Sequence, residues 1–200
     1  MKAQVLNDLF ASVFTREDLS NLPAPETYPS TFKENLIFDQ NAIAKCLGNL
    51  KDSKSPGPDD ISAYLIKHLA KPLNVQLYFI FEQSLVESRI PEDWRRANVT
   101  PIFKKGDRRS PGNYRPVSLT SIICKVMEQF VRRNILNHML KNEFKCQEQH
   151  GFLNGKSCIT NLLETIDDWT SSLDAKKQLD TLYLDFRKAF DTVPHARLLT

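Results

Sequence analysis

The sequence predicts an α+β fold in which helices predominate over strands. Several stretches carry apolar side chains at helical spacing, and the longest of them covers residues 120–140. Two short runs, 99–103 and 113–119, flank a long glycine-containing loop, which is typical of a β-hairpin. A third apolar run, Leu182 to Leu184, is expected to form a short buried strand.

Composition places the chain among ordinary globular proteins, with 41% hydrophobic and 26% charged residues in 200. The net charge of +3 is small, but it is unevenly distributed. Residues 1–60 carry six lysines and arginines against nine acidic residues, whereas residues 89–145 carry thirteen against five. This basic middle favours a phosphate-binding surface. The alternative is that the cations line a solvated helix face.

The four cysteines form neither a CxxC pair nor a Cys/His cluster of zinc spacing, which fits reduced thiols. No apolar run approaches the roughly 20 residues of a membrane span, and the N-terminus lacks a signal-peptide core. We therefore expect an intracellular location, in the nucleus or cytoplasm, without secretion and without a membrane partner. The oligomeric state is left open by the sequence.

The N-terminal elements follow from local signals. Residues 3–14 predict an amphipathic helix, the prolines of 20–31 an extended linker, and residues 32–38 a short strand. Asp39 is expected to cap a helix that ends at Leu50, and Asp59 or Asp60 to cap the first of two helices over 61–71 and 73–88. Trp94 is expected to be a packing anchor.

Two loops stand out in composition. In residues 51–61, prolines on both sides of Gly57 fix a tight turn. In residues 147–158, two glycines allow close backbone approach to a ligand, and His150 is expected at the surface. A helix over 159–173 should follow, with Leu162, Leu163, Ile166 and Trp169 pointing inward.

The predicted hairpin concentrates cations near its tip. Lys104 and Lys105 end the first strand, and Arg115 begins the returning segment. Point-charge lysines and a fork-shaped arginine suit the oxygens of a triphosphate. The alternative is a basic hairpin that serves only solubility.

Asp185 follows the predicted buried strand directly. A carboxylate at the end of such a strand is costly unless a cation meets it, and hard cations such as magnesium take oxygen ligands. The alternative is that Asp185 caps the turn that follows.

Four segments, taken in order, resemble those of reverse transcriptases from non-LTR retrotransposons. The resemblance covers about residues 50–200, and although each segment is weak evidence, the ordered set is specific. The segments are Lys54-Ser-Pro-Gly-Pro-Asp-Asp-Ile61, Lys104-Lys-Gly-Asp107 with Asn113-Tyr-Arg-Pro-Val-Ser-Leu119, Gln149-His-Gly-Phe-Leu-Asn-Gly-Lys-Ser157, and Leu184-Asp-Phe-Arg-Lys-Ala-Phe-Asp-Thr-Val-Pro-His195. Two departures are Asp60, where the family usually has glycine, and Leu153, where it often has arginine.

The resemblance implies helix-rich fingers with a β-hairpin and the start of a right-hand polymerase palm. It divides the chain into an N-terminal helical extension and linker over 1–50, fingers over 51–175, and the first part of the palm over 176–200. It implies an RNA-directed DNA polymerase that uses Mg²⁺, with an RNA template, a DNA primer and deoxynucleoside triphosphates as partners.

The resemblance also implies roles for individual residues. Asp185 would be the catalytic ligand of both metal ions, and the ring of Phe190 would be the steric gate that excludes a ribose 2′-hydroxyl. For Phe190, the residue alone equally allows plain core packing. Arg115 would grip the triphosphate together with Lys104 or Lys105, between which the sequence does not decide. The implied nucleic-acid contacts are Lys54, Ser55, Gln149, Gly151 and Lys156.

The family's second catalytic motif, Tyr/Phe-Ala-Asp-Asp, does not occur in these residues. A pair of catalytic metal ions needs several carboxylates, so Asp185 alone cannot hold it. We therefore expect the N-terminal part of a polymerase domain, inactive and marginally stable by itself. Two alternatives are a nucleic-acid-binding module and a non-functional remnant of a mobile element.

Overall fold

The computed structural model describes residues 2–21, 36–142, 148–186 and 188–198. They belong to two compact units, one of residues 1–135 with 190–200 and the other of residues 136–189. The predicted linker over 20–31 lies almost wholly outside the described residues. The first part of the predicted strand over 32–38 also lies outside them, and residues 36–38 form no strand. The domain boundaries inferred from the resemblance stay a prediction.

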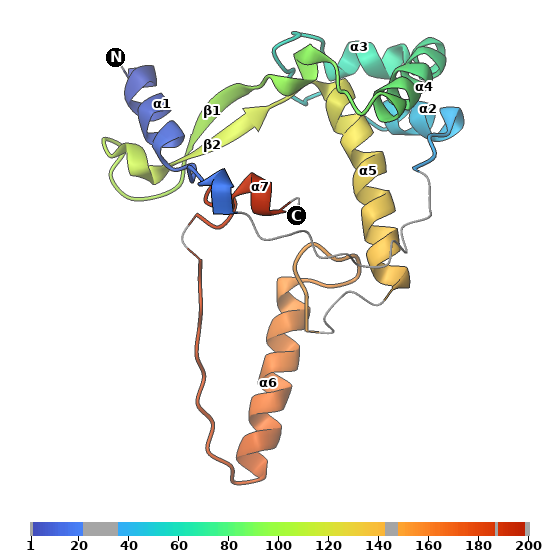
Figure 1. Ribbon diagram of the computed structural model, residues 1–200. Coiled ribbons are helices and arrows are strands. Elements are labelled where there is room, and N and C mark those ends of the chain that lie inside the picture. The colour runs from blue at the N-terminus through green and yellow to red at the C-terminus, as the bar shows by residue number, and fades with distance from the viewer. Residues whose placement is uncertain (1, 22–35, 143–147, 187, 199–200) are drawn as a thin grey trace. The chain divides into compact units, whose positions relative to one another are not determined.

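The described chain is mostly helical, with one two-stranded antiparallel sheet, so the α+β class is confirmed in broad terms (Figure 1). The helix α5 begins in the first unit and continues into the second. The elements are α1 (Lys2–Ser12), α2 (Gln40–Gly48), α3 (Ala63–His68), α4 (Ala70–Val86), β1 (Asn98–Phe103), β2 (Tyr114–Leu119), α5 (Ile122–Lys141), α6 (Cys158–Asp174) and α7 (His195–Leu198), with short 3-10 turns at Leu19–Asn21, Glu92–Arg95 and Pro111–Asn113.

The starts of α2 and α3 test the predicted caps. Asp39 caps α2, since its carboxylate accepts a hydrogen bond of 2.7 Å from the amide of Ala42. The prediction that Asp59 or Asp60 caps the next helix is wrong, because Ser62 accepts the 3.2 Å bond from the amide of Leu65. The turn extends further than expected, with Asp60 in the left-handed region at φ 54° and Asp59 bonded to the amide of Ile61.

The core of the first unit lies where α2, α3 and α4 meet the first half of α5. Phe38 joins these helices, with its ring centroid 5.2 Å from that of Phe81 and 5.7 Å from that of Phe130. The ring centroids of Trp94 and Phe81 are 5.8 Å apart, and Trp94 packs against the core, so it is a packing anchor as predicted. The buried hydrophobic residues are Phe38, Ile43, Leu47, Leu50, Ala63, Ile66, Ala70, Leu77, Phe81, Ile122, Val126, Met127 and Phe130.

The hairpin of β1 and β2 emerges from this core between Trp94 and α5. Its antiparallel register pairs Asn98 with Leu119 at the base and Phe103 with Tyr114 near the tip. The helix α1 lies against the 3-10 turn Pro111–Asn113 in the hairpin loop. The hairpin is thus supported at its base by the core and at its tip by α1.

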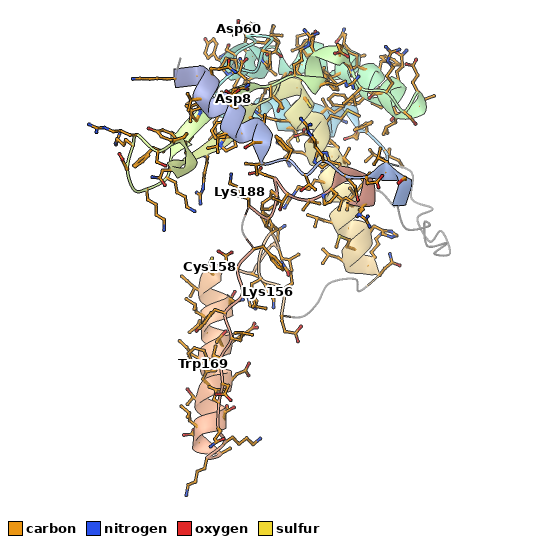
Figure 2. All side chains as sticks on the ribbon, turned by 60° about the vertical axis from the view of Figure 1, so that its left-hand side comes forward. Asp8, Asp60, Lys156, Cys158, Trp169 and Lys188 are labelled. Carbon is orange, nitrogen blue, oxygen red and sulfur yellow. The ribbon has the colours of Figure 1, made fainter. Side chains whose placement is uncertain are left out.

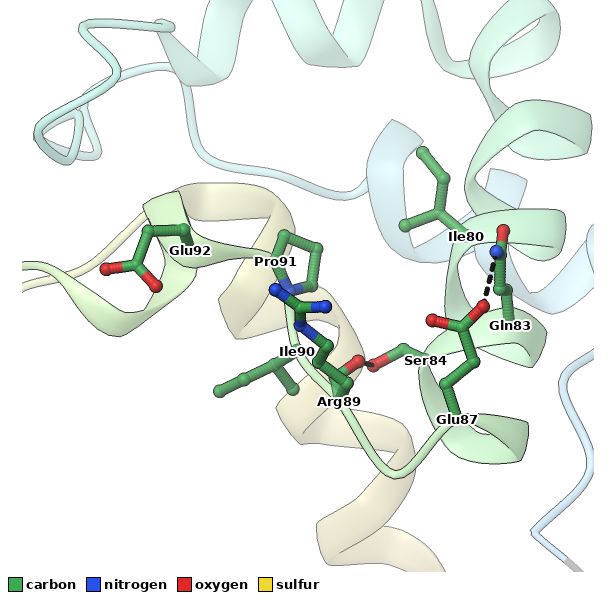
Figure 3. Close-up of a pocket in the computed structure, with 8 residues that line it drawn as sticks. All are labelled: Ile80, Gln83, Ser84, Glu87, Arg89, Ile90, Pro91 and Glu92. Carbon is green, nitrogen blue, oxygen red and sulfur yellow. Dashed lines mark hydrogen bonds between the residues drawn. The ribbon is translucent and has the colours of Figure 1, made fainter.

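The C-terminus of α4 closes with a Schellman motif. The amide of Arg89 donates to the carbonyl of Ser84 at 3.0 Å, and that of Ser88 to the carbonyl of Leu85 at 3.1 Å. Ser88 takes the left-handed conformation, at φ 50°. Figure 3 shows the pocket of about 280 Å³ beside this turn, where the hydroxyl of Ser84 donates to the carbonyl of Arg89 at 2.8 Å. None of the predicted site residues lines this pocket.

In the second unit, α6 forms where the sequence predicts a helix, but the predicted burial is wrong. Leu162, Leu163 and Ile166 are 60%, 60% and 53% exposed, and the helix holds no buried residue. Residues 182–184, expected to be a buried strand, belong to no strand and are at least 80% exposed. A strand needs a hydrogen-bonded neighbour, and among the described residues β1 and β2 pair only with each other.

No helix in the described part of the chain has both the length and the apolar character needed to cross a membrane.

Candidate nucleotide and nucleic-acid interface

The loop at the tip of the hairpin has a defined shape. Asn113 donates from its side-chain amide to the carbonyl of Asp107 at 2.9 Å, and its backbone carbonyl accepts from the amide of Lys104 at 2.8 Å. Asp107 in turn accepts from the amide of Arg109 at 2.9 Å. Gly106 has φ 88°, and a Cβ at this position would lie 2.7 Å from the side-chain nitrogen of Asn113. These hydrogen bonds therefore fix the backbone of the loop that carries the cations.

An aromatic pair occupies one face of the hairpin. The rings of Phe103 and Tyr114 lie 5.5 Å apart, and the guanidinium carbon of Arg108 lies 4.7 Å from the centroid of Phe103. The hydroxyl of Tyr114 donates to the carbonyl of Arg108 at 2.9 Å. Arg108 is thus held on the aromatic face by a cation–π contact.

The register assigns the other cations to faces. Ile102 lies opposite Arg115, so these two residues share the face that Phe103 and Tyr114 do not occupy. Extending the pairing by one residue sets Lys104 opposite Asn113, as its backbone hydrogen bond indicates. Alternation then puts Lys104 on the face of Arg115, whereas Lys105 lies in the bend beyond the paired strands. All three cationic side chains are exposed.

The loop between α2 and α3 is fastened to the start of α5. Gly57 is buried, and a Cβ added to it would lie 2.5 Å from the backbone nitrogen of Ser121. Three residues earlier, the amide of Lys54 donates to the carbonyl of Lys51 at 3.1 Å. The side chains of Lys54 and Ser55 are exposed. These predicted contacts therefore stand on a turn that is anchored to the core.

Residues 148–157 form a compact loop before α6. The side-chain amide of Gln149 donates to the carbonyl of Gly151 at 3.1 Å. Phe152 and Gly155 are left-handed, at φ 62° and 77°. Ser157 caps α6 by accepting from the amide of Thr160 at 3.2 Å. Figure 2 shows Lys156 beside Cys158 at the start of α6, with Trp169 further along the helix.

His150 was expected at the surface, and this prediction is wrong. Its side chain is buried, with Nδ1 2.9 Å from the hydroxyl of Thr160 and Nε2 2.8 Å from a carboxylate oxygen of Glu164. The hydrogen bond from His150 lowers the pKa of Glu164, and the charge of Lys156, 3.7 Å away, acts in the same direction. Thr160 and Glu164 are one turn apart and so share a helix face, but their spacing does not identify His150 as their partner.

Asp185 and Phe190 fall in different units, and both are exposed. Core packing of Phe190 is not found, since its side chain is 79% exposed. The turn after Phe190 is tied to the N-terminal segment, where Thr15 donates to the carbonyl of Thr192 at 2.8 Å and the largely buried Glu17 pairs with Arg197.

Within the described residues, no group of three or more His, Cys, Asp or Glu could hold a metal ion. The carboxylate of Asp185 is a suitable oxygen ligand, but a pair of metal ions needs several such groups. The donor set among the described residues therefore does not fit a catalytic metal pair.

Comparison with known proteins adds to this geometry. Residues 102–200 match the family described as "Reverse transcriptase (RNA-dependent DNA polymerase)". The chain is 28% identical over 162 residues to the "Probable RNA-directed DNA polymerase from transposon X-element" of Drosophila melanogaster, a match that covers 80% of this chain and 18% of that protein. It is 24% identical over 201 residues to the "RNA-directed DNA polymerase from mobile element jockey" of Drosophila funebris, covering 98% of this chain and 22% of that protein. The chain thus spans about a fifth of the length of these relatives.

Proposed function

Because the chain belongs to the reverse transcriptase family of non-LTR retroelements, we propose that it is part of an RNA-directed DNA polymerase. Residues 1–50 would form an N-terminal helical extension and linker, residues 51–175 helix-rich fingers, and residues 176–200 the start of the palm. Its partners would be an RNA template, a DNA primer and deoxynucleoside triphosphates. We place it inside the cell, where its cysteines stay reduced.

The observation that carries this proposal is the shared face of Lys104 and Arg115. It lies within the residues that match the family, on a hairpin whose tip is braced by Gly106, Asp107 and Asn113. A lysine and an arginine on one face can meet adjacent phosphates as a point charge and a two-pronged donor. We therefore assign the triphosphate contact to Arg115 and Lys104. Lys105 lies outside the paired strands, in the bend that follows Lys104.

The remaining roles rest on the resemblance and on where the side chains lie. Lys54, Ser55, Gln149, Gly151 and Lys156 stand on two loops that the fold anchors, and we propose that they contact the nucleic-acid strands. Phe190 would select the sugar by steric overlap with a 2′-hydroxyl.

Asp185 would be the catalytic carboxylate of the intact enzyme. The Mg²⁺ that the family generally uses would require carboxylates beyond those that the described residues bring together.

Triphosphate binding by the whole chain tests the hairpin assignment. We expect Lys104→Ala and Arg115→Ala each to weaken binding of a fluorescent deoxyadenosine triphosphate. The loss should be roughly tenfold or more, because a hydrogen bond to a charged group contributes about 1.5–3 kcal/mol. Lys105→Ala is the matched control, with the same charge removed from the bend beyond the paired strands. Equal losses from Lys104→Ala and Lys105→Ala would refute the assignment of the triphosphate contact to Lys104.

A second candidate function is nucleic-acid binding without polymerisation. It is favoured by the basic stretch over 89–145, because clustered cations attract phosphates. A salt series with a labelled RNA separates the two. A steep salt slope without triphosphate binding would support the binding module, because each phosphate contact releases counterions. A chain that binds neither ligand would support neither function for these residues by themselves.

A further inference from the structure

We propose that His150 is a positioning residue, which fastens residues 149–156 to α6 so that this loop meets a single-stranded nucleic acid in one preformed shape. This inference rests on the proposed function, from which it takes the ligand class. It assigns to the buried imidazole a role that the sequence did not indicate.

The imidazole bridges the loop to two successive turns of the helix. Nδ1 reaches the hydroxyl of Thr160 at 2.9 Å, and Nε2 reaches the carboxylate of Glu164 at 2.8 Å. Thr160 is itself bonded to the backbone of Ser157, accepting from its amide at 2.8 Å. Both ring nitrogens therefore have partners on α6, and the ring is 6% exposed. A side chain with two fixed partners and little exposure has one orientation.

The contacts of His150 with Thr160 and Glu164, which we call the clamp, also position a cation. The ammonium of Lys156 lies 3.5 Å from Nε2 of His150 and 3.7 Å from the other carboxylate oxygen of Glu164. Lys156 is one of the residues proposed to contact a phosphate. Its position is thus set by the same carboxylate that holds the imidazole.

Between His150 and Lys156 the backbone is strained at one residue. Phe152 has φ 62°, a region that side chains with a Cβ rarely adopt, and its ring is 79% exposed. Strained conformations persist only where the surroundings hold them, and they gather at binding sites. Proteins bind single strands by stacking bases on exposed aromatic rings and meeting phosphates with cations, and this loop carries both Phe152 and Lys156. The chemistry of the loop therefore fits a single strand.

The test uses the whole chain and a labelled oligouridylate. His150→Ala removes the clamp, and His150→Gln keeps a side chain that can hydrogen-bond to α6. His68→Ala is the control, because it removes an exposed imidazole from α3. Hydrogen exchange of the 149–157 amides reports the clamp, while anisotropy reports binding. Circular dichroism checks that the helices are retained.

We expect His150→Ala to raise exchange in residues 149–157 at least tenfold and to weaken oligouridylate binding about tenfold. His150→Gln should recover part of both effects, and His68→Ala should change neither. Phe152→Ala should weaken binding in the parent chain but have little further effect in the His150→Ala chain, because two residues that act together are not additive. A merely structural histidine would not show this coupling to Phe152.

Three results would overturn the proposal, and they are distinguishable. Unchanged exchange in His150→Ala would show that the loop does not need the clamp, whatever the chain binds. A parent chain that binds no oligouridylate would remove the nucleic-acid contact and with it the positioning role, even if exchange rises. Additive effects of Phe152→Ala and His150→Ala would show that the histidine does not act through the ring.

Discussion

Gly57→Ala should destabilise the first unit more than its small change in volume suggests. A Cβ at residue 57 would lie 2.5 Å from the backbone nitrogen of Ser121 and 2.6 Å from the carbonyl carbon of Thr120. Non-bonded heavy atoms prefer separations of about 3.5–4.0 Å, so the overlap is on the order of 1 Å. Both obstructing atoms are backbone atoms at the start of α5, and no side-chain rotation can relieve the contact.

The expected magnitude follows from the rigidity of those atoms. Overpacking by one or a few carbon atoms typically destabilises a protein by about 1–3 kcal/mol. Because the obstruction is backbone, we expect a loss near the upper end, about 3 kcal/mol. The loop must then move away from α5, which also displaces Lys54 and Ser55.

Gly48→Ala supplies a matched control within the same chain. Gly48 is the last residue of α2, and a Cβ there would have nothing within 4 Å. Alanine is the better helix former, so this variant should gain up to about 1 kcal/mol. Urea unfolding followed by circular dichroism measures both variants, with the change in midpoint at constant slope as the readout. A Gly57→Ala midpoint equal to that of the parent would refute the packing of this loop on α5.

Three further predictions concern single groups. Ser88→Gly should raise the free energy of unfolding by about 0.5–1 kcal/mol, because Ser88 holds a left-handed conformation that glycine adopts without strain; a lower urea midpoint would contradict this. Burial, with Glu128 nearby, raises the pKa of the Cys124 thiol to about 11, so iodoacetamide at pH 8 should label the exposed Cys158 well before Cys124, and peptide mass spectrometry would reveal the reverse order. The hydrogen bond from His150 is the main cause of the lowered pKa of Glu164. The bond between these two side chains should therefore stabilise the loop fully above a pH of about 4.5, and this stabilisation should be lost as the pH falls through the lowered pKa. In an NMR titration His150→Ala should bring this pKa back toward its ordinary value, and an unchanged pKa would count against the bond.

Helices and hairpin were predictable because their signals are local. The spacing of apolar residues in α5 and the cap at Asp39 depend on neighbours in sequence, and both are confirmed. The start of α3 was misplaced for a related reason. Ser62 and Asp60 are both good caps by type, and the choice between them depends on the left-handed backbone at Asp60. That conformation results from how the turn packs at Gly57, which is a tertiary effect.

The burial of His150 shows what a pattern of residue types omits. A histidine beside a glycine in a polar loop is most simply placed at the surface, and only the return of the loop onto α6 makes it a bridge. The partners Thr160 and Glu164 were visible as an i, i+4 pair, but nothing in their spacing names the residue that they receive. The sequence shows which side chains can form hydrogen bonds, whereas the path of the folded chain decides which of them meet.

The apolar run before Asp185 also shows that a sequence pattern does not fix tertiary pairing, here beside the proposed catalytic residue. A short continuous apolar run of this kind is typical of a buried strand, yet residues 182–184 are almost fully exposed and unpaired by any described strand. A strand is not a property of its own residues, because its hydrogen bonds and its buried face are both completed by neighbours. The exposed apolar residues of α6 in the same unit have the pattern of a helix that covers such a sheet. Asp185 would therefore acquire a fixed geometry only when strands pair beside it, so its proposed role belongs to the assembled palm and not to the segment alone.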